Sequence, residues 1–343
     1  MREFDYSSLK DKTWDSEIIS LVAQIHEYKG RQEVYLKQKP EELDRLVEIA
    51  KRQSTEASNA IEGIRTTSTR LKQLCEEKTT PKNRDEEEIL GYRDVLNTIH
   101  ENYEYIPIKT NYILQLHRDL YKYTEKSIGG YFKISQNVIA ATDEIGNEYV
   151  LFTPLAPYET PDAIEAICEN YNRMIENEVL DSILLIPIFI YDFLCIHPFS
   201  DGNGRMSRLL TALLLYRSGY VVGKYVSIES KIAKNKDLYY KALEDCQEDV
   251  TSFVKYMLRV ILAAYRDFEE RVELVSEKLP AKEIVRHAVY NKIGKLSKSD
   301  IAELCPSIGI KSVELALKQL VEEGVLLKKG AGRATFYIRS DSK

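Results

Sequence analysis

The sequence predicts a mainly α-helical protein that carries one small β-hairpin and ends in a separate, smaller unit. Apolar residues recur at helical spacing through most of the chain, which is typical of amphipathic helices packed around a core. Residues 129–152 break this pattern, and residues 281–343 follow the order helix, helix, helix, hairpin. The 343 residues suffice for two domains, and 44% hydrophobic with 30% charged residues is an ordinary composition for a globular protein.

The helical segments are separated by conventional stop signals. Pro40 lies between the first two segments, and Gly63 ends the second. The most apolar run, Ile183–Ile196, contains Pro187 and Asp192 and is too short for a membrane span, so it predicts a buried core helix. The spacing predicts helices at 15–37, 41–62, 84–102, 110–122, 160–179, 182–196, 203–217, 234–246 and 250–277.

The hairpin is expected in the stretch "GGYFKISQNVIAATDEIGNEYVLF", residues 129–152. Its residues alternate more than those of the helical segments, and two runs of β-branched or aromatic residues flank the dipeptide Gly146-Asn147. Glycine and asparagine tolerate the left-handed backbone that a tight hairpin turn requires. These features predict two antiparallel strands.

A domain boundary is expected at Lys278, Leu279 and Pro280. The three short helices and the basic, Gly-rich hairpin that follow have the order of a winged helix-turn-helix. This unit carries 12 Lys and Arg against 7 Asp and Glu, whereas the whole chain has a net charge of -6. We therefore predict an N-terminal helical region, a central core and a winged-helix domain, with the bounds 1–110, 111–278 and 281–343.

The acidic balance of the whole chain gives no reason to expect a nucleic-acid surface along its full length. Its five cysteines are scattered without a CxxC pair, which favours reduced thiols and a cytoplasmic location. The first residues contain no apolar run of the kind that a secretory signal needs, and no membrane partner is expected.

Candidate chemistry is concentrated in "HPFSDGNGRMSR", residues 197–208. The turn Gly202-Asn203-Gly204 leads into a predicted helix, whose first N–H groups and positive dipole end form an anion site suited to phosphate. Arg205 and Arg208 are three positions apart and are therefore neighbours on that helix. Two guanidinium groups beside such a turn indicate a ligand with more than one phosphate.

Two further residues of this stretch fit the same ligand. The carboxylate of Asp201 would repel phosphates unless it held a divalent cation that bridges them, and Mg²⁺ is the cation of choice. His197 is the one nearby group that acts as a base near neutral pH, and it is suited to accept a proton during phosphoryl-type transfer.

The stretch resembles the signature of the Fic family, H-x-F-x-[D/E]-G-N-G-R-x-x-R, at every defined position. The resemblance extends over roughly residues 50–260 and includes "EILGYRDVL", "ILQLHRDLY" and "GGYFKISQNVI". It implies a Fic-type helical core and a protein adenylyltransferase, which moves AMP from ATP to a Ser, Thr or Tyr hydroxyl of a protein and releases pyrophosphate.

The resemblance also implies a role for each residue of the motif. His197 would deprotonate the target hydroxyl, and Asp201 would hold Mg²⁺ between the α- and β-phosphates. Asn203 would steady the α-phosphate within the Gly202–Gly204 cradle. Arg205 would contact the β-phosphate and Arg208 the γ-phosphate.

The predicted hairpin would be the family's flap, which pairs with the backbone of the target protein by strand addition. One position departs from the family, which often has Arg where this chain has Lys133. Lysine keeps the charge but loses the bidentate fork of arginine.

A second segment, "STEASNAIEGIRTT" at residues 54–67, resembles the inhibitory motif of the family, [S/T]-x-x-x-E-[G/N]. Ser58, Glu62 and Gly63 match it. Glu62 lies at the end of a predicted helix, where the dipole is negative, so a cation should compensate it. The resemblance implies that this cation is Arg208 and that the pair inhibits transfer. Self-modification and removal of AMP are further activities that the resemblance permits.

Other interpretations remain at this stage. The chain could be a DNA-binding regulator, with Lys311, Lys328, Lys329 and Arg333 on phosphate backbone and the Fic core as a nucleotide-responsive module. It could also be an enzyme that transfers a different phosphate-containing group. A homodimer is common among relatives and is expected here on that ground alone.

Overall fold

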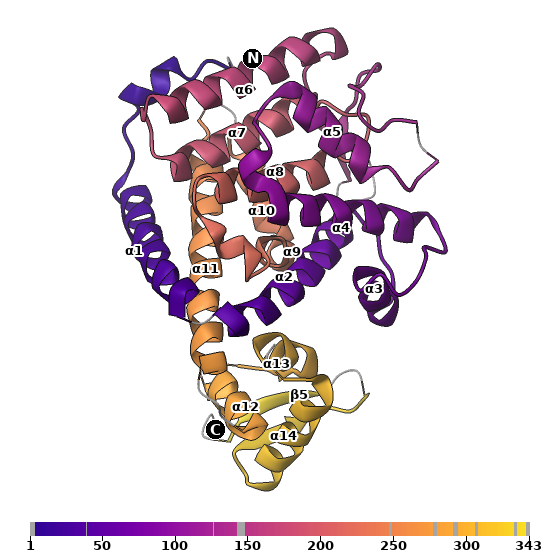
Figure 1. Cartoon of the computed structure of the whole chain (residues 1–343), viewed down its shortest axis with the longest axis vertical. Coiled ribbons are helices and arrows are strands. Elements are labelled where there is room, and N and C mark those ends of the chain that lie inside the picture. The colour runs from indigo at the N-terminus through magenta and orange to yellow at the C-terminus, as the bar shows by residue number, and fades with distance from the viewer. Residues whose placement is uncertain are drawn as a thin grey trace. The chain divides into compact units, whose positions relative to one another are not determined.

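We describe a computed structural model of the chain that covers residues 4–38, 40–125, 127–142, 148–246, 249–276, 280–290, 294–305, 308–332 and 335–340. The protein is mainly helical and comprises two compact units (Figure 1). The first unit contains residues 1–29 and 50–264, and the second contains residues 30–49 and 265–343. The helices α1 (Ser16–Gln38), α2 (Pro40–Ile61) and α11 (Thr251–Ser276) each contribute residues to both units.

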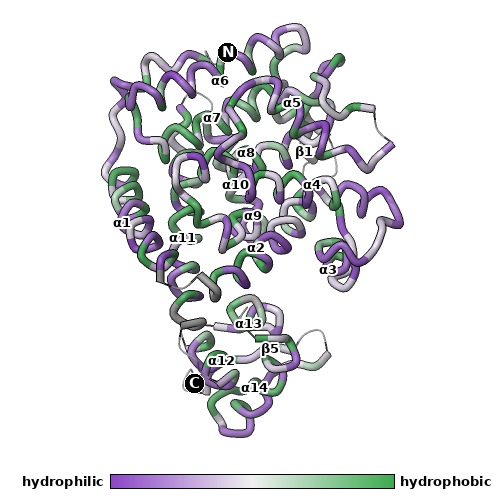
Figure 2. Tube along the Cα trace, viewed as in Figure 1, coloured by the Kyte–Doolittle hydropathy of each residue, from purple (hydrophilic) through white to green (hydrophobic). Residues whose placement is uncertain are grey.

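The first unit is built around α7 (Ser182–Ile196), which is apolar on all sides (Figure 2). A helix of this composition must be buried completely, and α6 (Thr160–Glu176) and α8 (Asn203–Arg217) pack against it. Asp181 caps the N-terminus of α7 by accepting the N–H of Ile183 at 2.9 Å. The remaining helices of this unit are α3 (Ser68–Cys75), α4 (Arg84–Asn102), α5 (Thr110–Leu120), α9 (Ile228–Lys234) and α10 (Lys236–Glu244).

Two local features differ from the sequence-based expectations. The helix predicted at 234–246 is α10, Lys236–Glu244. Asn235 has a non-helical conformation and separates it from α9, Ile228–Lys234, which was not predicted. The short helix α3 was not predicted, since its eight residues carry only two buried leucines and give little periodic signal. It is capped by Thr67, which accepts the N–H of Arg70 at 3.3 Å.

The predicted hairpin consists of β1 (Ile139–Thr142) and β2 (Glu148–Phe152), which pair in antiparallel fashion. The Gly146-Asn147 turn lies outside the described residues. The register shifts between Ile139 and Ala140, so the pair contains an irregularity close to its start.

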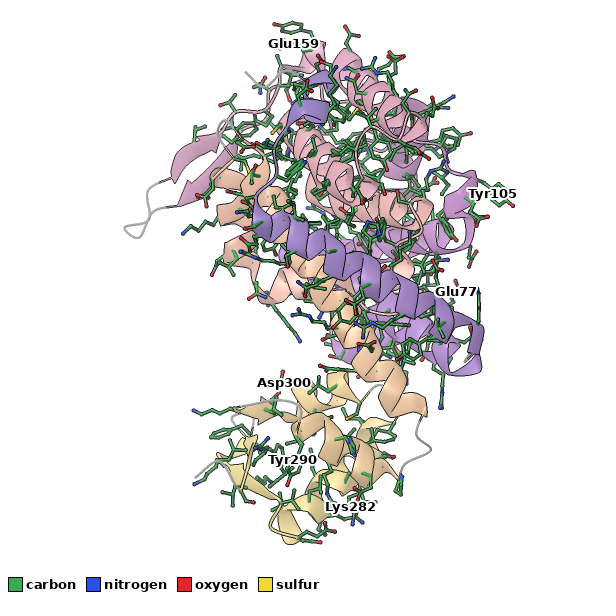
Figure 3. All side chains as sticks on the ribbon, turned by 90° about the vertical axis from the view of Figure 1, so that its left-hand side faces the viewer. Glu77, Tyr105, Glu159, Lys282, Tyr290 and Asp300 are labelled. Carbon is green, nitrogen blue, oxygen red and sulfur yellow. The ribbon has the colours of Figure 1, made fainter. Side chains whose placement is uncertain are left out.

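The second unit contains a small sheet with the strand order β3-β5-β4. Helix α13 begins with a capping box, because Ser297 accepts the N–H of Asp300 and the Asp300 carboxylate accepts the N–H of Ser297. Figure 3 marks the position of Asp300 in this unit. Arg333 and the expected boundary at residues 278 and 279 lie outside the described residues. The elements are α12 (Ala281–Tyr290), β3 (Leu296–Ser297), α13 (Lys298–Leu304), α14 (Ile310–Glu322), β4 (Leu326–Lys329) and β5 (Phe336–Arg339).

Among the described helices, none combines the length and the apolar content needed to cross a membrane. The five cysteines, all within the described ranges, are in the reduced form. The domain bounds 1–110, 111–278 and 281–343 remain a prediction.

Candidate active site

His197 follows the last residue of α7 and has a left-handed backbone, with φ of 50° and ψ of 62°. Such a conformation is uncommon for a residue other than glycine and is kept only where the surroundings impose it. Here the His197 N–H is donated to the Phe193 carbonyl at 2.9 Å, which ends the helix and turns the chain. The buried helix therefore fixes where the imidazole is placed.

The surroundings also keep this imidazole neutral. Burial, with a smaller contribution from the nearby Lys133 cation, lowers the pKa of His197 to about 4, although the Leu194 carbonyl opposes the shift. A group with this pKa is almost wholly unprotonated at pH 7. His197 is therefore in the form that accepts a proton.

The turn after His197 is fixed by its own side chains. Asn203 accepts the Phe199 N–H at 2.9 Å and donates to the Phe199 carbonyl at 2.7 Å. Asp201 accepts the Gly202 N–H at 2.7 Å, and Gly202 has a φ of 84°. A Cβ at Gly202 would also lie 2.9 Å from the Tyr121 hydroxyl, so glycine is required both for the backbone and for the space.

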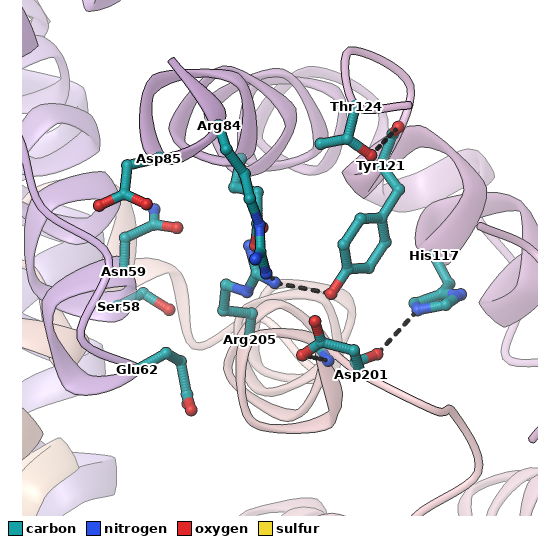
Figure 4. Close-up of polar contacts among 12 residues, drawn as sticks. Ser58, Asn59, Glu62, Arg84, Asp85, His117, Tyr121, Thr124, Asp201 and Arg205 are labelled. Carbon is teal, nitrogen blue, oxygen red and sulfur yellow. Dashed lines mark hydrogen bonds and ion pairs between the residues drawn. The ribbon is translucent and has the colours of Figure 1, made fainter. Parts of the chain in front are cut away.

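His117 joins this turn to the segment that precedes the hairpin (Figure 4). Its Nδ1 accepts the Gly130 N–H at 3.0 Å, so Nε2 carries the proton and donates to the Asp201 carbonyl at 3.1 Å. The ring stacks on Phe199 with a centroid separation of 3.6 Å. Burial lowers the pKa of His117 to about 4, which keeps this neutral tautomer. Only a histidine in a helical pattern was visible in the sequence, and that pattern does not indicate this role.

Lys133 fixes the same segment to the end of α7. It is buried, its ammonium donates to the Ile196 carbonyl at 2.9 Å, and its N–H donates to the Pro198 carbonyl at 2.9 Å. Burial lowers the pKa of Lys133 to about 8. The Asn137 side chain adds a bond to the Phe199 carbonyl at 2.8 Å. One ammonium group is enough to donate a hydrogen bond to the Ile196 carbonyl, so this contact does not need the bidentate group of an arginine.

Arg208 is held by residues at the end of α2 and directly after it, in the segment that resembles an inhibitory motif. Its Nε donates to the Ser58 hydroxyl at 2.8 Å, and its Nη2 donates to the Ser58 carbonyl at 3.0 Å and to Glu62 at 2.7 Å. Burial alone would lower the pKa of Arg208, but the Glu62 charge raises it above its usual value. Only 4% of the Arg208 side chain is exposed, against 33% for Glu62.

Glu62 also covers the first turn of α8. A Cβ at Gly204 would lie 2.2 Å from Glu62 Oε1, so the carboxylate lies directly against the glycine backbone. Glu62 follows the last residue of α2, and Gly63 continues the chain with a φ of 82°. Its negative charge therefore occupies the anion-binding end of α8.

Arg205 is bound to a different carboxylate, which the sequence analysis missed. Its Nη2 lies 2.7 Å from Glu88 on α4 and donates to the Tyr121 hydroxyl at 2.7 Å (Figure 4). Arg205 and Arg208 are thus both buried, and each is held by a separate helix. A buried glutamate inside the apolar pattern of "EILGYRDVL" was the available signal for Glu88, because a buried charge needs a partner.

The described residues contain no cluster of three potential metal ligands. Magnesium does not require one, since it is commonly held by one or two carboxylates together with substrate phosphates. Asp201 lies in the turn directly before α8, beside the predicted phosphate cradle. A single carboxylate in this place fits a nucleotide-borne Mg²⁺.

Comparison with known proteins agrees with this geometry. The model of the Fic/DOC family matches residues 107–215. This segment contains α5, the hairpin, α7 with His197, and nearly all of α8. The chain therefore carries a Fic/DOC domain, and its matching relatives include proteins named as adenylyltransferases.

A probable protein adenylyltransferase of Aquifex aeolicus is 27% identical over 183 residues, which are 53% of this chain and 53% of that protein. The protein adenylyltransferase Fic of Nematostella vectensis is 25% identical over 227 residues, 63% of this chain and 48% of its own. The chain thus spans about half the length of these curated relatives.

Solved structures support the fold. A Fic family protein of Desulfovibrio desulfuricans has a TM-score of 0.63 at 22% identity, covering 97% of this chain and 98% of that one. A Fic domain containing signaling protein of Bacteroides thetaiotaomicron has a TM-score of 0.61 at 24% identity, covering 75% of this chain and 97% of its own.

Proposed function

We propose that the chain is a protein adenylyltransferase that transfers AMP from ATP to a Ser, Thr or Tyr hydroxyl of a protein and releases pyrophosphate. The observation that carries this proposal is the position of a neutral His197 at the start of a turn that leads into α8, the helix that bears Arg205 and Arg208. A base, an anion-binding helix terminus and two guanidinium groups are the parts that nucleotide transfer needs. The names of the matching relatives support the same activity.

In this mechanism the target hydroxyl attacks the α-phosphorus of ATP in line with the departing pyrophosphate. His197 accepts the hydroxyl proton, because its imidazole is neutral at working pH. The N–H groups at the start of α8 and the turn at Gly202–Gly204 bind the phosphates, and Asn203 holds that turn in shape. Arg205 and Arg208 would contact the β- and γ-phosphates.

Magnesium, when bound, neutralises the phosphate charge and polarises the phosphoryl oxygens. Asp201 is the residue proposed to hold it. The Asp201 backbone carbonyl accepts a bond from His117, which keeps this residue oriented toward the start of α8.

Inhibition is proposed to follow from competition for Arg208. A guanidinium held by Ser58 and Glu62 is not available to the γ-phosphate, and the Glu62 carboxylate repels phosphates from the start of α8. ATP would then bind in a pose that is unsuited to transfer. Removing Glu62 relieves both effects, and a charge pair of this kind is worth roughly 2–5 kcal/mol.

The test is incubation of wild-type, Glu62→Gly and His197→Ala protein with radiolabelled ATP, Mg²⁺ and a protein mixture. We expect Glu62→Gly to raise protein labelling, by roughly 30- to 5,000-fold if the whole effect reaches the barrier. His197→Ala combined with Glu62→Gly should abolish labelling. Labelling by Glu62→Gly at the wild-type level would contradict the inhibitory role, and undiminished labelling by the double variant would contradict the catalytic role of His197.

The protein target is proposed to dock on the flap. The base of the hairpin carries exposed apolar side chains, with Ile134 93% and Val138 50% exposed, and β2 adds Val150 at 60%. Such side chains suit an extended segment that pairs with the flap through its backbone. Self-modification, removal of AMP by water and a homodimer belong to the same proposal.

The winged-helix domain and DNA binding form the second candidate. Lys311, Lys328 and Lys329 are exposed. However, Lys298 and Lys282 are paired with Glu314 and Glu323, at 2.7 Å each, so that these two cations are neutralised locally. The enzyme is therefore the function that the chain's features favour.

A further inference from the structure

Arg84 is a third arginine beside the candidate active site, and neither the motif nor the proposed mechanism includes it. It is the first residue of α4, and 66% of its side chain is exposed. Its Nε donates to Glu88 Oε1 at 2.8 Å. Within the described part of the chain, its two terminal nitrogens make no hydrogen bond, so that the fork of the guanidinium is open to a ligand.

Glu88 holds Arg84 and Arg205 at the same time. Its Oε1 accepts from Arg84 at 2.8 Å, and its Oε2 lies 2.7 Å from Arg205. The carboxylate itself is only 2% exposed. Two guanidinium groups on one carboxylate leave a net charge of about +1, which attracts an anion.

Figure 4 shows the Arg84 side chain extending toward Arg205, beside Tyr121 and Asp201. The hydrogen bond that Arg84 donates to Glu88 is the main cause that raises the pKa of Arg84, and the charge of Asp201 adds to it. Arg205 cannot present its whole fork to a ligand, because it is 1% exposed and one amino group is committed to Glu88 and Tyr121. In Arg84, the bond from Nε to Glu88 holds the guanidinium group in place, and its two terminal nitrogens remain open to a ligand.

We propose that Arg84 binds the pyrophosphate end of the nucleoside triphosphate, both before and after that group leaves. The inference rests on the proposed function, since it assigns a ligand to the same site. A guanidinium fork suits two phosphate oxygens, and Glu88 fixes its position through a nitrogen that the fork does not need.

The charge balance of transfer explains why a third cation helps. The new bond joins the target oxygen to the α-phosphorus, and the hydroxyl proton goes to His197. The bond from the α-phosphorus to the bridging oxygen breaks, and its electron pair stays on the pyrophosphate, which becomes more negative. Arg84 stabilises that charge, and its exposure lets it follow the leaving group toward solvent.

The test is a comparison of ligand binding by isothermal titration, in the full chain with Glu62→Gly as background. Mg·ATP, Mg·pyrophosphate and AMP are titrated into Arg84→Ala and Arg84→Lys. We expect Arg84→Ala to lower the affinity for ATP and for pyrophosphate about tenfold each. The affinity for AMP should be unchanged, since AMP lacks the β- and γ-phosphates. The affinities of Arg84→Lys for ATP and pyrophosphate should lie between those of Arg84→Ala and the background protein, because lysine keeps the charge but lacks the two-nitrogen fork. Arg259→Ala is the matched control, since Arg259 is 60% exposed and paired with Glu17.

Equal pyrophosphate affinity in Arg84→Ala and the background would overturn the inference, and so would an equal loss of AMP binding, which would indicate a structural effect. A background protein that binds neither ATP nor pyrophosphate would overturn it as well. Protein labelling is read separately. If the background binds pyrophosphate through Arg84 but labels no protein, the proposed adenylyl transfer fails and the phosphate site stands.

Discussion

At the scale of single residues, the chemistry of the site depends on charges that their surroundings control. His197 is neutral because it is buried near Lys133, and His117 keeps one tautomer because Gly130 donates to its Nδ1. Arg208 and Arg205 are each neutralised by a carboxylate from another helix. The motif alone therefore does not determine which of its groups is available to a ligand.

The depressed pKa of His197 sets the expected pH dependence. An imidazole with a pKa of about 4 stays in its basic form from neutral pH down to about pH 5, and it gains a proton only as the pH falls through 4. We expect kcat/KM of Glu62→Gly to be flat on the acid side of neutrality and to decline below about pH 5, as the free enzyme's base determines this profile. A decline of kcat/KM centred near pH 6.5 would instead indicate a histidine with its usual pKa. The measurement is the initial rate of labelling across pH 4 to 8, with protein integrity checked by circular dichroism.

At the scale of elements, α2 connects the candidate inhibitory residues to the rest of the first unit. Its end is held by Lys236 of α10, which donates to the Ile61 carbonyl at 2.7 Å. Further back, Ser54 donates to Glu229 at 2.6 Å, and Tyr92 of α4 donates to the same carboxylate at 3.1 Å. The last turn of α2, which carries Ser58 and precedes Glu62, is thus positioned by two other helices.

Lys236 provides a test of this arrangement that leaves Glu62 and Arg208 intact. Lys236→Ala removes a cation from the C-terminal end of α2, a contact worth roughly 0.5–1 kcal/mol. We expect basal labelling to rise about two- to fivefold, because Glu62 is then held less firmly on Arg208. Lys241→Ala is the control on the same helix, since Lys241 is exposed. Unchanged labelling in Lys236→Ala, or an equal rise in the control, would contradict the role of this contact.

At the scale of the whole molecule, every residue assigned to the site belongs to the first unit. His197, Glu62, Glu88 and Arg84 all lie within residues 50–264. The second unit has its own apolar core, formed by residues such as Val285, Val313 and Leu320. Nucleotide binding should therefore not depend on the surface of the second unit.

Charge reversal at Lys328 and Lys329 tests this separation. Both lysines are exposed on β4, so replacing them with Glu should preserve the fold. We expect the ATP affinity of Glu62→Gly to stay within about twofold. The same variants in a salt-dependent gel shift with mixed-sequence DNA test the second candidate function. A marked loss of ATP affinity would show that the nucleotide site is not confined to the first unit.

The sequence by itself determined the elements whose signals are local. The apolar run before His197 predicted α7, and the turn before Arg205 predicted the start of α8 at Asn203. Periodicity depends only on residues that are close in sequence, so it can be recognised without knowledge of the tertiary structure. Helix α9 was not predicted, because its seven residues are too few to show a clear period.

Only the tertiary structure decided which partners meet. Glu62 and Arg208 are 146 positions apart and 2.7 Å apart in space, and that pairing was expected only from a resemblance. Tyr121, His117 and Arg84 had no pattern that linked them to the site, and the position of Glu88 in an apolar pattern indicated a need for a partner without naming it. The physical reason is that a buried charge requires a partner but does not specify which one. Long-range packing of α2, α4 and α5 around α8 made that choice.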